Sequence, residues 1–213
     1  HTLLLGEAAP KTLQYTYDAF SRPHIKRYPN NVAVEYQYNT HGYHQATRNA
    51  TTKNLYWQVQ QRNAYGEVTE EQFGNGVTTA RTYDLRMGRI ANIATQSMAA
   101  EQYQQLNYLH DSAGNLLQRR SHRNSASENL TETFQYDNLH RLTAAITTGL
   151  TSGSRTITHS YDALGNITQK SDRSDVNGYT YGEGNAGVHA VTRIEHNGQT
   201  TQYGYDSKGN MTT

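Results

Sequence analysis

The sequence predicts an all-β fold in which repeated β-hairpins lie side by side in one long antiparallel sheet. Three observations support this prediction. A motif of eight residues recurs along the chain, and apolar or aromatic residues alternate with polar ones before many of its copies. In addition, 17 of the 213 residues are tyrosine, although apolar residues make up only 34% of the chain. Alternation with a period of two is typical of half-buried strands, and a disordered chain of this polarity would be poor in aromatic residues.

The motif is clearest at residues 161–168, which read YDALGNIT, and at residues 205–212, which read YDSKGNMT. In such a motif the aromatic residue ends a strand, and the aspartate accepts a hydrogen bond from the backbone two residues further on. The glycine can adopt a positive φ, and the apolar residue begins the next strand. A loop of four or five residues that contains glycine is typical of a β-hairpin. Each motif, called an octet below, therefore predicts the turn of one hairpin.

Copies of the octet occur along the whole chain and indicate an internal repeat. A third close copy begins at residue 110, and weaker copies begin at residues 17, 38, 62, 83 and 136. The step from residue 161 to residue 205 is about twice the others, so we expect an altered copy within residues 179–193. The repeating unit is then about 23–24 residues long, which suits one hairpin and its connection to the next. The residues that we expect to shape the repeat turns are Tyr17, Asp18, Tyr38, Asn39, Tyr83, Asp84, Asp111, Gly114, Tyr136, Asp137, Tyr161, Asp162, Gly165, Tyr205, Asp206 and Gly209.

Runs of alternating apolar and polar residues predict the strands of these hairpins. The runs lie at residues 13–17, 32–38, 55–59, 134–136, 157–161, 179–181 and 203–205. Four runs carry tyrosines two positions apart, at 15/17, 36/38, 179/181 and 203/205, so each pair shares one face of the sheet. We expect these rings to stack between adjacent hairpins, which contributes about 0.5–1.5 kcal/mol per pair beyond the burial of area.

Five other segments are expected to connect or interrupt the strands. Residues 74–76, which read GNG, predict a tight turn, and residues 94–101 have a composition compatible with a helix. Residues 119–133 are polar and rich in serine and asparagine, so they predict a long loop. Residues 149–154 predict a shorter loop, and residues 170–178 predict a turn at the surface.

Charge and composition argue against several classes of function. The net charge is +1, from 19 basic and 18 acidic residues without a basic cluster, whereas nucleic-acid binding needs a basic stripe. No apolar run approaches the ~20 residues that span a bilayer, and the first residues show no signal-peptide pattern. The absence of cysteine excludes disulfides and thiolate metal sites.

The octets extend through almost the whole chain, which predicts a single domain over residues 1–213. The last octet ends at Thr212, which leaves no room for the return strand of its hairpin. We therefore expect this array to be a segment of a longer one.

Three patterns resemble functional sites but have simpler interpretations. Residues 182–187 match G-x-G-x-x-G, yet a dinucleotide site needs a following helix, and the next residues are strand-like. His41 and His44 could bind zinc together with a third ligand from a neighbouring hairpin, although a surface pair is the simpler interpretation. The acidic pairs at 70/71 and 172/175 are interpreted as solvated loop charges.

The aspartates of the octets recur with the period of the repeat. A residue that repeats with the scaffold is most simply part of the scaffold, so we interpret these aspartates as turn formers. The sequence therefore predicts no catalytic residue, no cofactor-binding residue and no metal ligand.

The pattern Tyr-Asp-x-x-Gly-Asn/Arg-apolar-Thr at this spacing resembles the YD repeat of the Rhs family. The octets at residues 161–168 and 205–212 match it closely. Residues 184–192, GNAGVHAVT, resemble another stretch of that family, in which proline usually stands at the position of Val188. The resemblance covers nearly all of residues 15–213.

The family includes Rhs toxins, the B and C components of insecticidal toxin complexes, and teneurins. The resemblance implies a long β-sheet that coils into a hollow shell, and in the bacterial members this shell encloses a C-terminal toxin. A self-cleaving aspartyl protease region follows the repeats in those members, but no residue here matches it. Neither self-cleavage nor a toxin activity is therefore carried over to this chain. We therefore expect a non-enzymatic shell segment of a secreted or cell-surface bacterial protein. Its partners would be the rest of the shell and the enclosed toxin domain.

A surface adhesion or carbohydrate-binding module is the alternative function. Exposed aromatic rings on a sheet can stack on sugars, and glycans would then be the partners. The candidate residues are tyrosines outside the register of the repeat, namely Tyr28, Tyr43, Tyr56 and Tyr103.

Overall fold

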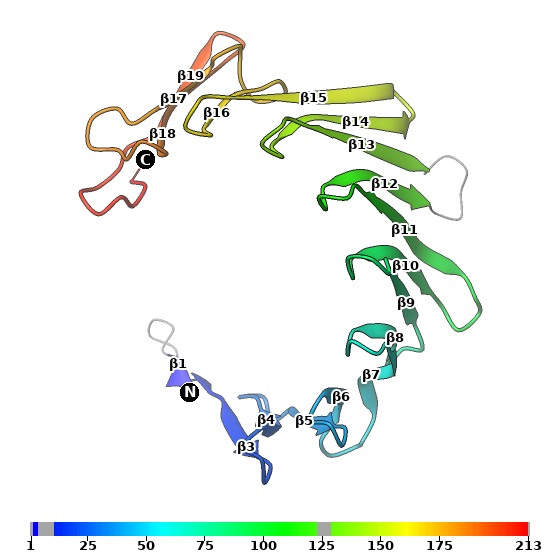
Figure 1. Cartoon of the computed structure of the whole chain (residues 1–213). Helices are drawn as coiled ribbons and strands as arrows, with labels where there is room; N and C mark the ends of the chain where they lie inside the picture. The colour runs from blue at the N-terminus through cyan, green and yellow to red at the C-terminus, as the bar shows by residue number, and fades with distance from the viewer. Residues whose placement is uncertain (1, 4–10, 123–128, 213) are drawn as a thin grey trace. The chain divides into compact units, whose positions relative to one another are not determined.

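The structure is a computed structural model that describes residues 2–3, 11–122 and 129–212 (Figure 1). All regular elements in these residues are β-strands, so the predicted all-β class is confirmed. The strands of the main sheet are β3 (Gln14–Tyr17), β4 (Pro23–Arg27), β5 (Ala33–Tyr38), β6 (His44–Asn49), β7 (Leu55–Arg62), β8 (Val68–Phe73), β9 (Thr78–Tyr83), β10 (Ile90–Gln96), β11 (Gln102–His110), β12 (Leu116–His122), β13 (Leu130–Tyr136), β14 (Leu142–Leu150), β15 (Gly153–Tyr161) and β16 (Ile167–Lys170). Two smaller sheets consist of β1 (Thr2–Leu3) with β2 (Lys11–Thr12), and of β17 (Tyr179–Tyr181), β18 (Val191–His196) and β19 (Gln199–Gln202).

The main sheet contains 14 antiparallel strands in the order of the sequence, from β3 to β16. Because each strand reverses direction, successive turns alternate between the two ends of the strands. The octet turns join β3 to β4, β5 to β6 and so on to β15 and β16, so within each compact part of the chain they lie at the same end of the strands. We call these turns the octet rim: residues 18–22, 39–43, 63–67, 84–89, 111–115, 137–141 and 162–166. The turns at the other end form the opposite rim: residues 28–32, 49–54, 73–77, 97–101, 150–153 and 171–178.

The chain divides into two compact units, residues 1–106 and residues 107–213. The first unit contains the octets that begin at residues 17, 38, 62 and 83. The second contains those that begin at residues 110, 136, 161 and 205. Each unit therefore has its own octet rim, and the single domain expected over residues 1–213 stays a prediction.

Residues 94–101 do not form the helix that their composition allows. Residues 94–96 belong to β10, where Ala94 pairs with Ala80 of β9. Residues 97–101 form a turn in which Ser97 N donates to Glu101 O (2.8 Å). The helix prediction is wrong because the neighbouring strand satisfies the backbone of residues 94–96 and overrides a weak helical propensity.

The long loop predicted at residues 119–133 is also wrong for its described parts. Residues 119–122 belong to β12 and residues 130–133 to β13, while residues 123–128 lie outside the described residues. Arg119 pairs with Glu132 across these strands, and their Nε and Oε2 atoms are 2.5 Å apart. Cross-strand pairs of opposite charge stabilise a sheet without apolar alternation, and single-sequence patterns do not reveal such partners.

The three remaining connections differ in how well they match their predictions. The GNG turn is confirmed, since Gly76 N donates to Phe73 O (2.9 Å). The turn at residues 170–178 is confirmed between β16 and β17. The loop at residues 149–154 is tighter than predicted, because β14 continues to Leu150 and β15 begins at Gly153.

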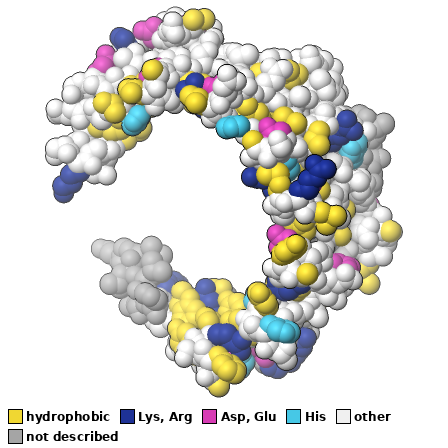
Figure 2. All heavy atoms as spheres, viewed as in Figure 1, with side chains coloured by type: hydrophobic (Ala, Val, Ile, Leu, Met, Phe, Trp, Pro, Cys, Tyr) yellow, Lys and Arg dark blue, Asp and Glu magenta, His cyan; other side chains and the backbone are white. Residues whose placement is uncertain are grey.

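Few side chains of the described residues are fully buried. The buried apolar residues are small or medium-sized, namely Ala33, Ala46, Val59 and Ala144. The buried polar residues are Glu71, Thr79, Asn166, Ser174 and Thr192. On the face drawn in Figure 2, hydrophobic side chains are interspersed with charged ones. Cross-strand ladders and side-chain hydrogen bonds, rather than a thick apolar core, therefore hold the hairpins together.

Glu71 corrects the prediction that the acidic pairs are solvated. It lies in the middle of β8, where Trp57 Nε1 donates to its Oε2 (2.8 Å) and Arg81 Nη2 pairs with its Oε1 (2.5 Å). A buried carboxylate needs such partners, because taking an unpaired charge out of water is costly. Asp172 likewise forms an ion pair with Arg155 (2.9 Å).

Candidate functional site

The structure places the predicted turn residues at the turns of the octets. The tyrosines Tyr17, Tyr38, Tyr83, Tyr136 and Tyr161 end β3, β5, β9, β13 and β15. The aspartate or asparagine that follows each of them begins the turn: Asp18, Asn39, Asp84, Asp137 and Asp162. Asp111 begins the turn after β11, and Tyr205 pairs with Met211 around the last octet.

Asp162 illustrates how an octet closes. Its Oδ1 accepts the backbone N–H groups of Leu164 (2.9 Å) and Asn166 (2.8 Å), and its Oδ2 accepts Asn166 Nδ2 (2.9 Å). Two backbone bonds complete the turn, from Asp162 N to Asn166 O (2.9 Å) and from Gly165 N to Asp162 O (3.1 Å). Gly165 has a φ of +89°, a region that favours glycine. The turn thus uses its own backbone donors internally.

Other octets use the same arrangement. In Asp18, Asp111, Asp137 and Asp206 the carboxylate also accepts the backbone N–H of the residue four positions on. Gly114 and Gly209 occupy the position of Gly165, also with positive φ. Asn39 accepts two N–H groups with its amide oxygen (2.9 and 3.0 Å). The longer turn after Asp84 is closed by N–H groups two and three residues on (2.9 Å each).

The hydrogen bonds of the octet favour the ionised form of its carboxylates. The Arg22 side chain lowers the pKa of Asp18 below its ordinary value, and the Asn210 side-chain amide does the same for the pKa of Asp206. A charged acceptor makes a stronger hydrogen bond than a neutral one. The ionised aspartate therefore suits the role of a turn former.

The tyrosine hydroxyls link consecutive octets, a role that sequence reasoning did not identify. Each hydroxyl donates to the backbone carbonyl of the first residue in the return strand of the preceding turn. The links run from Tyr38 to Pro23, Tyr83 to Val68, Tyr136 to Leu116, Tyr161 to Leu142, Tyr181 to Ile167 and Tyr205 to Val191, with O···O distances of 2.8–2.9 Å. Tyrosine rather than phenylalanine at the first position of six octets is the signal that could have indicated this use of the hydroxyl.

Burial keeps four of these hydroxyls protonated and able to donate. It raises the pKa of Tyr83, Tyr136, Tyr161 and Tyr181 above the ordinary value of a phenol. These four links are therefore neutral hydrogen bonds over the whole physiological pH range.

An arginine makes the same link where the octet lacks its tyrosine. Arg62 stands at that position, and its Nη2 donates to the carbonyl of His44, the first residue of β6 (2.8 Å). Other arginines reach forward along the rim. The guanidinium carbon of Arg22 lies 4.2 Å from the ring centroid of Tyr38, and that of Arg141 lies 4.7 Å from the ring of Tyr161. Hydrogen bonds and cation–π contacts thus connect neighbouring hairpins at the rim.

The altered copy expected within residues 179–193 consists of β17, a loop at residues 182–190 and β18. Its Tyr181 makes the hydroxyl link described above. The loop is held by Asn166, whose Nδ2 donates to Val188 O (3.1 Å) and whose Oδ1 lies 2.7 Å from His189 Nδ1. The G-x-G-x-x-G sequence is followed by strand β18 and not by a helix. A helix N-terminus that could bind a phosphate is therefore missing at this loop.

The two candidate zinc ligands lie in different environments. His41 is exposed in its turn. The ring of His44 contacts Tyr36, Tyr38 and Trp57 at centroid distances of 5.6, 5.8 and 4.8 Å, and burial lowers the pKa of its imidazole. Within the described ranges, no three His, Asp or Glu side chains come together as a metal site requires. The structure thus places His44 in an aromatic cluster.

The predicted tyrosine pairs stack only in part. Tyr179 and Tyr181 stack with their ring centroids 6.4 Å apart. Tyr36 and Tyr38 instead pack on His44. The stacking prediction is thus confirmed for the 179/181 pair, while the 36/38 rings have a histidine as their partner. The strand expected at residues 203–205 is wrong, because β19 ends at Gln202 and only Tyr205 makes an isolated bridge.

The four tyrosines proposed for glycan binding lie on separate elements and are at least 36% exposed. Tyr28 is on the opposite rim, Tyr43 on the octet rim, Tyr56 on β7 and Tyr103 on β11. Lys26 Nζ lies 4.7 Å from the ring centroid of Tyr28, and the guanidinium of Arg62 lies 5.1 Å from that of Tyr43. Two of the four rings are thus already covered in part by cations.

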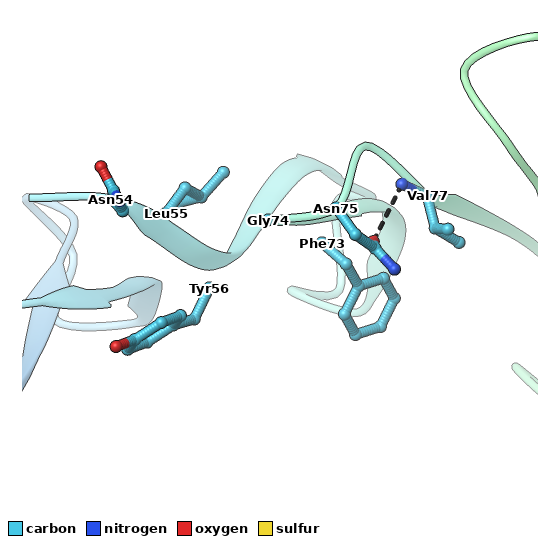
Figure 3. A pocket seen from close by; sticks show the side chains of 7 residues that line it. All are labelled: Asn54, Leu55, Tyr56, Phe73, Gly74, Asn75 and Val77. Carbon is cyan, nitrogen blue, oxygen red and sulfur yellow. Dashed lines mark hydrogen bonds between the residues drawn. The ribbon is translucent and has the colours of Figure 1, made fainter. Parts of the chain in front are cut away.

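A shallow groove of about 790 Å³ lies on the opposite rim beside Tyr56 (Figure 3). Its lining residues are Asn54, Leu55, Tyr56, Phe73, Gly74, Asn75 and Val77. In Figure 3 the rings of Tyr56 and Phe73 point to the same side of the ribbon. Asn75 Oδ1 accepts the N–H of Val77 (3.2 Å). Aromatic rings and amides therefore occur together in this groove.

These features define a class of structure: an all-β array of hairpins whose turns repeat a tyrosine–aspartate motif. The chain is similar in fold to the structure described as TcdB2-TccC3-Cdc42, with a TM-score of 0.73 at 16% identity over 95% of this chain. It is also similar to a Tc holotoxin pore of Photorhabdus luminescens (TM-score 0.66, 15% identity, 95% of this chain). TcdB2-TccC3 without its hypervariable C-terminal region gives a TM-score of 0.66 at 16% identity, again over 95% of this chain.

The likeness confirms the expected fold, an antiparallel array of β-hairpins. This chain spans only 12–13% of the length of those chains. No protein-family model matches the sequence, and a search of curated proteins finds no similar sequence. In the part of the chain that the structure describes, no helix has the length and hydropathy to cross a bilayer.

Proposed function

We propose that the chain is a structural segment of the shell of an Rhs-type secreted bacterial toxin. The shell encloses and protects a toxic C-terminal domain that is carried elsewhere in the protein. The observation that supports this proposal most is the similarity in fold to TcdB2-TccC3 over 95% of the chain. One similar structure is TcdB2-TccC3 with Cdc42, and another is TcdB2-TccC3 without its hypervariable C-terminal region.

The proposed mechanism is containment without catalysis. Backbone ladders join each strand of the main sheet to the next, and tyrosine hydroxyls join the octet turns. A sheet held by both kinds of bond resists local opening, because one hairpin cannot separate without losing its ladder bonds and its hydroxyl bonds at the rim together. In this proposal residues 1–213 form one array within a longer shell, and its partners are the remaining shell and the enclosed domain.

The reading frame that encodes this chain provides the first test. If the repeats continue on both sides and end before an unrelated C-terminal domain, the shell assignment is supported. Limited proteolysis of the purified parent protein then checks containment, since the enclosed domain should resist protease until the shell is denatured. A frame that continues into a cell-wall anchor would contradict the proposal.

The groove beside Tyr56 favours one second candidate, a surface module that binds carbohydrate. Tyr56 and Phe73 could stack on a sugar ring while Asn75, beside Phe73, binds its hydroxyls. A glycan array separates the two functions. Specific binding that Tyr56→Ala abolishes supports the carbohydrate module, and an array without binding leaves the shell as the proposal.

A further inference from the structure

The sequence contains three Asn-Gly pairs, at residues 75–76, 177–178 and 197–198. Asparagine is among the thermolabile residues, and it deamidates most readily before glycine. Glycine has no side chain to keep its backbone nitrogen away from the amide carbon of the asparagine. The three pairs have the same covalent chemistry, so their surroundings in the fold decide which of them can react.

The pair at residues 75–76 is held in its turn on the opposite rim. Gly76 N donates to Phe73 O (2.9 Å), and Asn75 Oδ1 accepts the N–H of Val77 (3.2 Å). The side chain of Met98 packs so closely on Gly76 that an added Cβ atom would meet its sulfur. Both the nitrogen that would attack and the amide that it would attack are therefore already engaged.

The pair at residues 177–178 is enclosed by backbone. Gly178 is buried, its N–H donates to Asp175 O (3.0 Å), and its carbonyl accepts from Glu195 N (2.8 Å). A Cβ atom at Gly178 would lie 2.5 Å from Glu195 O and 2.9 Å from Asp175 N. Turning the Gly178 nitrogen toward the side chain of Asn177 would break its hydrogen bond in a site without free space. Deamidation is therefore opposed here as well.

The pair at residues 197–198 has neither restraint. It forms the turn between β18 and β19, where both residues are exposed and have positive φ (52° and 73°), as is typical of Asn-Gly in a tight hairpin. Among the hydrogen bonds of the described residues, none is donated by Gly198 N, and a Cβ atom at Gly198 would meet nothing within 4 Å. The nitrogen of Gly198 can therefore turn toward Asn197 without losing a hydrogen bond or meeting a neighbour.

The side chain of Asn197 is also well placed for its amide nitrogen to leave. Its Nδ2 lies 3.1 Å from His196 Nε2, which is within reach for the transfer of a proton. From the other side, Asp175 Oδ1 accepts the backbone N–H of Asn197 (3.0 Å) and holds the residue in place. The amide that reacts thus has an imidazole beside it, while the attacking nitrogen has no competing partner.

We propose that Asn197 is a self-modification site, at which the folded chain slowly converts the asparagine to isoaspartate and aspartate. Gly198 N forms a bond to Asn197 Cγ and loses its proton, and the bond from Cγ to Nδ2 breaks. Nδ2 takes up one proton and leaves as ammonia, so the first product is a cyclic succinimide. Water then opens this ring. Attack at Cγ gives aspartate, and attack at the main-chain carbonyl carbon of residue 197 gives isoaspartate.

The modification is expected to loosen the edge strand β19. Isoaspartate adds a carbon atom to the main chain of the turn, so the pairing of His196 with Gln199 cannot keep its geometry. The new carboxylate also stands near that of Asp175, and like charges repel. Because β18 is the one strand that pairs with β19 in the described part of the chain, no second ladder compensates for this loss.

The test keeps the folded 213-residue chain in neutral buffer below its unfolding temperature and follows all three sites in the same sample. Peptide mapping by mass spectrometry measures the conversion of each asparagine, and labelling with protein isoaspartyl methyltransferase detects isoaspartate. Asn197 should react about tenfold or more faster than Asn75 and Asn177. The chain unfolded in urea is the reference, in which the three sites should react at similar rates.

Two matched variants identify the source of the isoaspartate label. Asn197 and Asn177 have φ values of 52° and 56°, which glycine adopts without strain. Asn197→Gly should therefore fold and lose most of the label, whereas Asn177→Gly should keep it. Conversion at Asn75 or Asn177 that is as fast as at Asn197 in the folded chain would overturn the inference. The same preference for Asn197 in urea would also overturn it, because the fold would then not select the site.

Discussion

The octet rim and the opposite rim use the same backbone turn. In the octet, Asp162 N donates to the carbonyl four residues on (2.9 Å), and Gly165 N donates back to Asp162 O (3.1 Å). On the opposite rim, Phe73 N and Gly76 N make the same two bonds (2.8 and 2.9 Å). The two glycines have φ values of +89° and +84°.

The two rims differ in what their side chains do. On the octet rim one aspartate accepts two backbone N–H groups and a side-chain donor, and a tyrosine hydroxyl reaches the preceding turn. On the opposite rim Asn30 and Asn75 each accept one N–H group, from the residue two positions on (3.2 Å). These asparagine bonds stay within their own turns.

This comparison separates two roles of the octet, which are to form a turn and to link one hairpin to the one before it. The backbone can form the turn without tyrosine and aspartate, as Phe73 and Asn75 show. The octet is therefore more than a turn signal, because its tyrosine connects one hairpin to the one before it. Predictions that distinguish the two rims test this interpretation.

The largest effect is expected from Gly74→Ala on the opposite rim. A Cβ atom at this position would lie 1.9 Å from the backbone oxygen of Leu55, which cannot move aside as a flexible side chain could. We expect a loss of about 3 kcal/mol in the free energy of unfolding, measured by urea denaturation.

Gly165→Ala on the octet rim is the matched comparison. A Cβ atom there meets nothing within 4 Å, so only the positive φ opposes it. The expected loss is about 1–2 kcal/mol. If both substitutions lower the free energy of unfolding equally, the close backbone approach at Gly74 does not distinguish the opposite rim from the octet rim.

The next largest effect is expected from Tyr136→Phe combined with Tyr161→Phe. Each substitution removes a hydroxyl bond to a part-buried carbonyl, of Leu116 (2.9 Å) or Leu142 (2.8 Å). A typical net loss is about 1 kcal/mol per bond, so the pair should lower the free energy of unfolding by about 2 kcal/mol. Urea denaturation measures this loss.

Tyr56→Phe controls for the loss of a hydroxyl elsewhere. The Tyr56 hydroxyl accepts from Asn49 Nδ2 (2.9 Å) at an exposed site near the opposite rim. Its removal should change the free energy of unfolding by less than about 0.5 kcal/mol. A similar loss from Tyr56→Phe and from either octet tyrosine would show that the hydroxyl links contribute no more to stability than an exposed hydroxyl bond does.

The sequence was sufficient for the features that depend on local pattern. Alternating residues such as those at 32–38 and 157–161 indicated strands, because strand faces repeat every two residues. Glycine and asparagine in GNG indicated a turn for conformational reasons that are equally local. Both kinds of signal lie within a few residues.

Features that depend on distant partners could not be predicted in this way. Residues 94–96 are a strand because β9 pairs with them, and Glu71 is buried because Trp57 and Arg81 bind it. The acceptor of the Tyr161 hydroxyl is a backbone carbonyl 19 residues away. Every residue has such a carbonyl, so the sequence does not indicate which residue provides the acceptor.

The smallest effect expected is a selective loss of hydrogen-exchange protection at the octet rim in acid. Hydrogen bonds from Arg22 and Asn210 lower the folded-state pKa of Asp18 and Asp206. A carboxylate with a lowered pKa stabilises the fold above its unfolded value, about 3.9 for aspartate. That stability is lost as the pH falls from about 4 through the lowered folded value. The asparagines of the opposite rim do not titrate in this range.

Amide hydrogen exchange can follow this loss turn by turn between about pH 5 and pH 2, after correction for the intrinsic exchange rate. The N–H groups of Phe20 and Lys208, which donate to Asp18 and Asp206, should lose protection as the pH falls. Those of Val32 and Val77, which donate to asparagine, should keep it. Asp206→Asn should remove the pH dependence at Lys208, because the amide oxygen still accepts but does not titrate, as Asn39 does in its own octet. Equal loss of protection on both rims would instead indicate that acid unfolds the sheet as a whole, independently of the octet carboxylates.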